Sequence, residues 1–210
     1  MKGVLDLLRR STPADETGGK TDSVLFTSAF ADQGVDPAML VPWDARANEV
    51  GARRVPAARG VALLQALWAK DKYMSRLESA AVKRLERYFE FAAVDADRDV
   101  IRQDEYGNFM VVLLTGTIAV DRIQPWGEQL RLTEARPGDI LGEMSLLDSG
   151  KRFSVCTTLT ECELAILGTQ AMDEMVAGEP QRAAALVALL ARKLSMRLRV
   201  VGARLSDRQN

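Results

Sequence analysis

The sequence contains no histidine, and this absence restricts its chemistry more than any other feature of its composition. Catalytic triads of the Ser-His-Asp and Cys-His kinds need an imidazole, as do metal centres with histidine ligands. An enzyme built from this chain would have to work with carboxylates, lysines or tyrosines alone. We therefore predict a protein that is not an enzyme, with no catalytic residue, no metal site and no cofactor.

Cysteine is also scarce, with 2 in 210 residues. Cys156 and Cys162 lie six positions apart without a CxxC pattern, which favours reduced thiols packed in a core. The sequence has no apolar run of the roughly 18 to 20 residues that span a bilayer. Its N-terminal stretch, MKGVLDLLRR, has no hydrophobic region typical of a signal peptide. We expect a cytoplasmic protein that does not contact membranes.

Neither sign of charge dominates the composition. The chain has 28 Lys and Arg against 29 Asp and Glu, for a formal net charge of −1. This balance provides no general support for nucleic-acid binding. The length of 210 residues suits one well-buried core, with or without a smaller additional segment.

The pattern of residue types changes along the chain. Residues 11–24 are rich in Ser, Thr, Gly and acids, which is typical of disorder. Residues 25–58 carry isolated apolar side chains between turn residues and predict little regular structure, packed on their own domain or on a partner. We predict a flexible or extended N-terminal arm over residues 1–58 and one folded domain over residues 59–210.

Regular structure is expected within the folded domain. Apolar residues at helical spacing between positions 60 and 92 indicate one or two amphipathic helices, the second beginning near SRLESAA. Four stretches then follow a strand pattern: FMVVLLTGTIAVDRI, EQLRLTEA, SVCTTLT and ECELAIL. Short strands separated by turns indicate an antiparallel sandwich or roll. The predicted fold class is α+β, an antiparallel β-roll with flanking N-terminal helices and a long C-terminal helix.

The last helix is predicted from Pro180 to about Leu205 and has two distinct faces. One face carries a heptad-like apolar stripe, which predicts packing on the roll or pairing with a second copy. The stripe consists of Val187, Leu190, Leu194, Val201 and Leu205. The opposite face is basic and favours a solvated surface over a nucleic-acid contact. The basic residues are Arg182, Arg192, Lys193, Arg197, Arg199 and Arg204.

One loop places an acid and a base at the two ends of an apolar run, GEMSLLDSGKRFS (residues 142–154). The run EMSLLDS suits one or two helical turns, and the N–H groups at the start of such a turn attract an anion. The planar guanidinium of Arg152 can hold two phosphate oxygens. Glu143 can accept a hydrogen bond from a sugar hydroxyl. We expect the two side chains to converge on one small ligand that carries a phosphate and a sugar.

The wider stretch PGDILGEMSLLDSGKRFS, together with the later LTECEL, resembles the phosphate-binding cassette of the cyclic nucleotide-binding domain family. The resemblance extends over about residues 75–205. It implies that Arg152 binds the phosphate and that Glu143 accepts the ribose 2′-hydroxyl. The family's C-terminal helix folds over the base as a lid and forms the dimer contact in related regulators, which implies a homodimer here. The implied ligand-binding residues are Gly142, Glu143, Met144, Ser145, Arg152, Phe153 and Ser154, and the candidate lid residues are Arg192, Lys193, Met196 and Arg199.

Phe153 and Ser154 depart from the family pattern, which has a small residue and then Ala at these positions. The Phe153 ring can turn into the core, fill part of the pocket, stack on a base or close the pocket. An aromatic ring suits guanine, so the candidate ligands are cyclic AMP, cyclic GMP and cyclic di-GMP.

Several functions remain open. The first is a sensor that binds a cyclic nucleotide and, through closure of its last helix, signals to an unidentified protein partner. A transcription factor needs a helix-turn-helix beyond that helix; the sequence ends at Asn210, so we expect no direct DNA binding. A cupin-like enzyme would need metal-binding histidines. A degenerate roll that acts only as a scaffold is opposed by Glu143 and Arg152 and favoured by Phe153.

The N-terminal arm is a candidate for partner docking or internal regulation.

Overall fold

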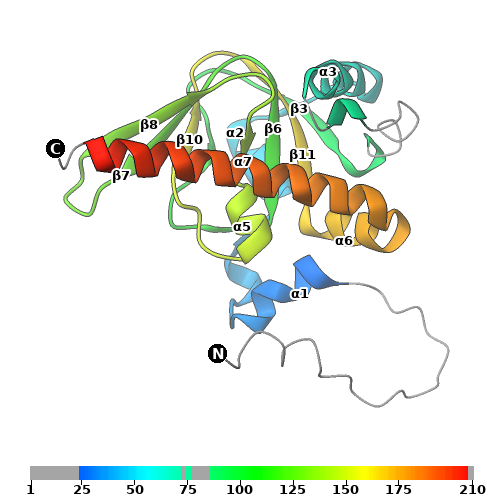
Figure 1. Cartoon of the computed structure of the whole chain (residues 1–210), viewed down its shortest axis with the longest axis horizontal. Coiled ribbons are helices and arrows are strands. Elements are labelled where there is room, and N and C mark those ends of the chain that lie inside the picture. Colours follow the sequence, from blue (N-terminus) through cyan, green and yellow to red (C-terminus); the bar gives the residue numbers. More distant parts are fainter. Residues whose placement is uncertain (1–23, 72–73, 77–85, 208–210) are drawn as a thin grey trace.

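The computed structural model describes residues 24–71, 74–76 and 86–207 (Figure 1). Two antiparallel sheets stack into a roll, and a long C-terminal helix crosses its front, which confirms the predicted α+β fold class. The helices are α1 (Leu25–Asp32), α2 (Trp43–Val50), α3 (Ala57–Lys70), α5 (Glu143–Asp148), α6 (Thr169–Gly178) and α7 (Pro180–Asp207), with short 3-10 turns at Pro37–Met39, Met74–Arg76 and Glu86–Tyr88.

The strands form two main sheets and one short parallel pair. Their order is β2-β3-β11-β6-β9 in the larger sheet and β4-β10-β7-β8 in the smaller one, and β1 pairs with β5. The strands are β1 (Leu40–Val41), β2 (Arg53–Arg54), β3 (Glu90–Val94), β4 (Asp99–Ile101), β5 (Tyr106–Gly107), β6 (Phe109–Thr115), β7 (Ile118–Ile123), β8 (Gln129–Ala135), β9 (Ile140–Leu141), β10 (Val155–Thr158) and β11 (Cys162–Gly168).

Strand β6 is apolar at almost every position because both of its faces are buried. Met110, Val112 and Leu114 pack toward helices α3, α6 and α7, in one core cluster. Val111 and Leu113 alternate with them and pack between the two sheets, in a second cluster. A strand that is covered on both sides needs no polar face, which explains the uninterrupted run FMVVLL.

Gly116 lies in the turn that joins β6 to β7. This glycine has φ +88°, and a side chain there would place a carbon 2.7 Å from the Cys162 sulfur. Strand β8 forms the outer edge of its sheet, and the register shifts between Val120 and Asp121. Leu132 therefore packs partly against the inner core, whereas Leu130 is exposed.

Helix α3 confirms the first amphipathic helix expected between residues 60 and 92. The second expected helix falls mainly on residues 77–85, which lie outside the described part of the chain. The disorder expected over residues 11–24 likewise falls almost wholly outside it. Cys156 and Cys162 are unpaired and buried, as predicted. Within the described ranges, no helix is long and apolar enough to cross a membrane.

The segment from residue 25 to 56 differs from its prediction, because it holds two helices and two short strands where little regular structure was expected. The apolar residues of this segment are far apart in sequence, yet Phe30 and Trp43 are each buried against the domain. The backbone N–H groups of Phe26 and Thr27 donate to the Asp173 carboxylate of α6, at 2.8 and 2.9 Å. Tertiary contacts thus stabilise helices that the local pattern does not indicate.

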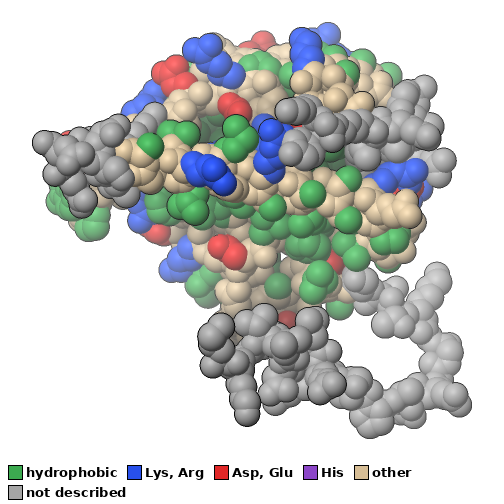
Figure 2. Space-filling view, in the orientation of Figure 1, with side chains coloured by type: hydrophobic (Ala, Val, Ile, Leu, Met, Phe, Trp, Pro, Cys, Tyr) green, Lys and Arg blue, Asp and Glu red, His purple; other side chains and the backbone are tan. Residues whose placement is uncertain are grey.

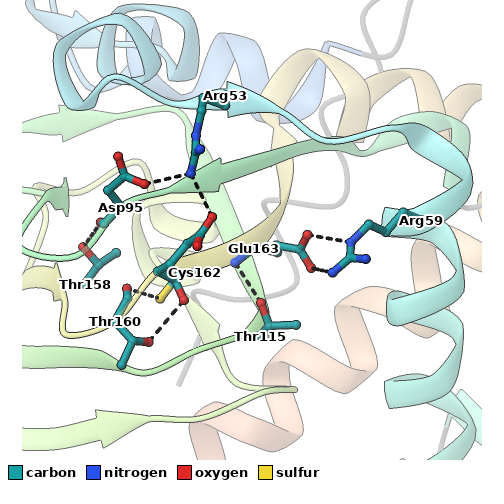
Figure 3. A network of polar contacts seen from close by, with 9 residues as sticks. Arg53, Arg59, Asp95, Thr115, Thr158, Thr160, Cys162 and Glu163 are labelled. Atoms are coloured by element: carbon teal, nitrogen blue, oxygen red, sulfur yellow. Dashed lines mark hydrogen bonds and ion pairs between the residues drawn. The ribbon is translucent and has the colours of Figure 1, made fainter.

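Ion pairs hold the next part of the segment on the larger sheet (Figure 3). Arg53 contacts Asp95 and Glu161 at 2.7 and 2.8 Å. Arg59 donates two hydrogen bonds to the Glu163 carboxylate, at 2.7 and 3.2 Å. The segment therefore docks on its own domain; the domain boundary at residue 58 stays a prediction.

Candidate functional site

Helix α5 carries the first part of the candidate site. Gly142 precedes it with φ +76°, a left-handed conformation that glycine adopts without a steric penalty. Gly142, the N-cap residue, has no side chain to cap the helix, and the Glu143 carboxyl is hydrogen-bonded to its own backbone N–H in the first turn.

Arg152 reaches the start of α5 from the loop that follows this helix. Its Nη1 donates to the Gly142 carbonyl at 2.8 Å and its Nη2 to the Phe109 carbonyl at 2.6 Å. Its Cζ lies 4.6 Å from the centre of the Phe109 ring. The side chain is only 3% exposed. The structure thus brings Arg152 to the residue directly before Glu143, with a fully inward guanidinium.

Two glycines make room for this guanidinium. A side-chain carbon at Gly107 would lie 2.5 Å from both Nε and Nη2 of Arg152, and one at Gly142 would also collide with the guanidinium. Real carbon atoms do not approach polar atoms this closely, so the arginine would have to move.

Burial changes the acid–base properties of Arg152. Loss of hydration lowers the pKa of its guanidinium to about 10, while the nearby acidic groups, Glu105 and Glu143 among them, act in the opposite direction. At neutral pH the group is therefore still a cation. A buried cation that donates only to carbonyl oxygens has no full counter-charge, and an anion would supply one.

Glu143, the first residue of α5, is also buried, with 3% of its side chain exposed. Its carboxylate pairs with Arg197 of α7, and Arg197 also donates to the Ile140 carbonyl at 2.6 Å. Burial raises the pKa of the Glu143 carboxyl, and the charge of Arg197 opposes that shift. Helix α7 thus already covers the acidic end of the site.

Phe153 points outward. Its side chain is 52% exposed, and the Arg122 guanidinium lies 4.5 Å from the ring centre. Arg122 also donates to the Phe153 carbonyl. The orientation into the core, one of the four left open, is contradicted, because the strand β10 begins only at Val155 and the ring leaves the loop toward solvent. Contact of this ring with a ligand stays a prediction.

The other predicted cassette residues divide by exposure. Ser145 is buried in the first turn of α5, whereas Met144 beside it is exposed. Ser154 is partly buried and lies 4.0 Å from the Cys156 sulfur, measured from its hydroxyl oxygen. The cassette therefore has a buried polar interior and an apolar outer rim.

The four candidate lid residues lie on α7 around Arg197. Lys193 donates to the Gly138 carbonyl at 3.0 Å, and it lines a cavity of about 230 Å³ between α3, the β8–β9 loop and α7. Arg192 is partly buried, and Met196 and Arg199 are exposed. The residue of α7 that pairs with Glu143 is Arg197, which was not among the four candidates.

Arg197 is the lid residue that sequence reasoning missed. It belonged to the basic face of the predicted helix, but nothing singled it out within that face. The available signal was its position four residues after Lys193, on the side that turns toward the cassette.

Comparison with known proteins agrees with this geometry. Residues 93–179 match the family described as Cyclic nucleotide-binding domain. The chain is 28% identical over 118 residues to a CRP-like cAMP-activated global transcriptional regulator of Mycobacterium tuberculosis, covering 56% of this chain and 53% of that protein. It is 29% identical over 107 residues to the Cyclic AMP receptor protein of Thermus thermophilus, covering 51% and 50%. The chain thus spans about half the length of these curated relatives.

A solved structure shows the same fold. The cyclic nucleotide-binding domain from Methylobacillus flagellatus aligns with a TM-score of 0.68 and 21% identity, over 73% of this chain and 86% of that one. The matched residues include α5, Glu143 and Arg152. Residues 93–179 thus match the cyclic nucleotide-binding domain family in sequence, and the fold around them is that of a solved cyclic nucleotide-binding domain.

Proposed function

We propose that this protein is a sensor that binds a cyclic nucleotide at the start of α5. The observation that carries the proposal is the buried Arg152 guanidinium, whose acceptors within the described part of the chain are the Gly142 and Phe109 carbonyl oxygens. A phosphate at this position would give the cation its missing counter-charge. Its oxygens would also accept hydrogen bonds from backbone N–H groups of the first helical turn. Catalysis is not part of the proposal.

Binding would require two exchanges of partner. Arg152 would turn part of its guanidinium from the carbonyls to the phosphate. Glu143 would give up Arg197 and accept the ribose hydroxyl instead. Because Arg197 belongs to α7, occupancy of the site changes what holds this helix against the domain. A ligand that prefers one position of α7 shifts the population toward it, and this shift is the signal.

Cyclic AMP is the first candidate ligand. It is supported by the two curated relatives, one of which is described as cAMP-activated and the other as a cyclic AMP receptor. Cyclic GMP and cyclic di-GMP are alternatives because the exposed Phe153 ring is able to stack on a guanine.

The signal is proposed to pass to a protein partner, with a second copy of the chain as part of the assembly. The apolar stripe of α7 divides in two: Leu190 is buried on the roll, whereas Val201 is exposed, as is Leu198, which the stripe as predicted did not include. An exposed apolar ridge on a helix that is otherwise packed suits a symmetric helix pair. The two unpaired thiols suit a reducing compartment such as the cytoplasm.

Titration calorimetry of the purified protein with cyclic AMP, cyclic GMP and cyclic di-GMP tests the proposal. We expect one of them to bind, and Arg152→Gln to weaken that binding by about two orders of magnitude. Gln keeps an N–H donor for a carbonyl and removes the charge. Arg152→Glu is a poorer choice, because its carboxylate would face the Gly142 and Phe109 carbonyls without a donor.

Arg59→Gln is the matched control, since this arginine lies on the outer side of the larger sheet with Glu163. Its affinity should equal that of the wild type. If no nucleotide binds to folded wild-type protein, the scaffold function replaces the sensor function.

A further inference from the structure

The N-terminal segment passes directly behind Arg152. Strand β1 pairs in parallel with β5, so that Leu40 lies opposite Tyr106 and Val41 opposite Gly107. Gly107 is one of the two glycines that leave room for the Arg152 guanidinium. The backbone that makes this room is therefore held in place by residues from the start of the chain.

The first residue of α2 reaches the same site through an aromatic pair. Trp43 meets Phe109 edge to face, with the ring centres 5.5 Å apart. Phe109 in turn lies under the Arg152 guanidinium and accepts its hydrogen bond. Two separate contacts of the N-terminal segment thus end on groups that touch Arg152.

Arg46 of α2 makes the third contact, through a charged side chain that is buried. Its side chain is 1% exposed and forms ion pairs with Glu49 and Glu105. Its Nε has no hydrogen-bond partner among the residues that the structure describes. A buried ion pair with an unsatisfied donor contributes little net stability, because desolvation offsets the attraction. The net contribution of these ion pairs to folding stability therefore does not explain why an arginine is buried at position 46.

Glu105 connects the two buried arginines. Its carboxylate pairs with Arg46, and its carbonyl accepts a hydrogen bond from the Arg152 backbone N–H at 2.8 Å. The Asp104 N–H donates to the Arg152 carbonyl at 2.9 Å, so the two backbones run side by side. The negative charge of Glu105 also acts on Arg152, raising the pKa that burial lowers. A Glu105 carboxylate released from Arg46 would compete for the Arg152 guanidinium.

We infer that Arg46 is a positioning residue of the anion site: it binds the Glu105 carboxylate and so keeps the Arg152 guanidinium available to an anionic ligand. This inference rests on the proposed function, because it assigns a role in the same site. It also gives the N-terminal segment an internal role in ligand binding.

The inference predicts a rescue that structural damage would not produce. Arg46→Met should weaken cyclic AMP binding about tenfold, because the freed carboxylate of Glu105 pairs with Arg152. Adding Glu105→Gln to this variant removes the competing charge and should restore affinity to within about threefold of the wild type. The affinity of Glu105→Gln alone should lie within about threefold of the wild type, because no competing carboxylate remains. This variant provides a measurement of the role of Glu105 if Arg46→Met does not fold.

Arg53→Met is the matched control. Arg53 docks the same segment on the larger sheet through exposed ion pairs with Asp95 and Glu161 (Figure 3). Its cyclic AMP affinity should stay within about twofold of the wild type. Cyclic GMP and cyclic di-GMP are titrated in parallel, so that the comparison uses whichever of the three binds.

A measurement without ligand separates this inference from the proposed function. The Arg152 Nε–H resonance in ¹⁵N NMR should move in Arg46→Met and return toward its original position in the double variant. If the wild type binds no nucleotide, the proposed function fails, and the resonance still decides the role of Arg46. An unmoved resonance, unchanged affinity in Arg46→Met, or no recovery in the double variant would overturn the inference.

Discussion

The Arg152 guanidinium lies among backbone atoms because two of its neighbours are glycines. Position 142 also requires glycine because its φ is positive. The effect of a substitution there would therefore combine backbone strain with steric collision. Gly107 has no positive φ, and only the absence of a side chain matters at this position. It is therefore the cleaner residue on which to test the geometry of the site.

Gly107→Ala should weaken binding of the cyclic nucleotide by about tenfold or more. The new methyl group would lie 2.5 Å from Nε and Nη2 of Arg152 and would push the guanidinium off the Gly142 and Phe109 carbonyls. The measurement is titration calorimetry on protein whose folding is checked by thermal denaturation.

Gly168→Ala is the control for this substitution. Its nearest neighbour, the Asn108 carbonyl, lies 3.7 Å from the added carbon, an ordinary contact. Equal losses of affinity in both alanine variants would show that the space at Gly107 is not specific to Arg152.

Helix α7 is held in two different ways along its length. Its first half is fixed by apolar burial, with Leu186 and Leu190 fully covered by the core. Further along, polar contacts tie α7 to the roll: Lys193 donates to the Gly138 carbonyl, and Arg197 pairs with Glu143. The second half can therefore be released without disturbing the core, which suits a helix that transmits a signal.

Arg197→Met should loosen this second half while the fold stays intact. We expect amide hydrogen exchange over residues 194–203 to become about tenfold faster, because a charged hydrogen bond to a buried carboxylate is lost. Ser195→Ala, an exposed position of the same helix, should exchange like the wild type. Unchanged protection in Arg197→Met would mean that Glu143 does not hold the helix.

The whole molecule presents apolar side chains on the second half of α7, the helix that crosses the front of the roll (Figure 1; space-filling view in Figure 2). Leu198 is 73% exposed there, with Val200 and Val201 beside it. The N-terminal segment is fastened to the opposite part of the domain, through α1 on α6 and through its ion pairs to the larger sheet. The exposed end of α7 is thus available to a second copy.

Leu198→Asp should convert a dimer into a monomer at micromolar concentration, because two carboxylates would meet near the two-fold axis of a helix pair. Light scattering coupled to size-exclusion chromatography measures the mass directly. Leu25→Asp changes another exposed leucine, on α1, and should leave the mass unchanged. A wild-type protein that is monomeric under these conditions contradicts the proposed dimer.

Periodic patterns in the sequence predicted most of the fold. The apolar run of β6, the glycine turn after it and the stripe of α7 each depend on residues within a few positions of one another. The segment at residues 25–56 escaped prediction because its helices are short and are stabilised by distant partners such as Asp173. Local propensity is a weak guide where burial is supplied from elsewhere in the chain.

The sequence by itself determined that this chain contains no histidine and that Glu143 and Arg152 lie at the two ends of one apolar loop. Composition and short-range spacing are sufficient for both statements. Only the tertiary structure decided that Glu143 pairs with Arg197, 54 residues away, and that Arg46 lies in the same buried network as Arg152. Charged side chains look alike in a sequence, and which of them lose their water and must find a partner depends on how distant elements pack.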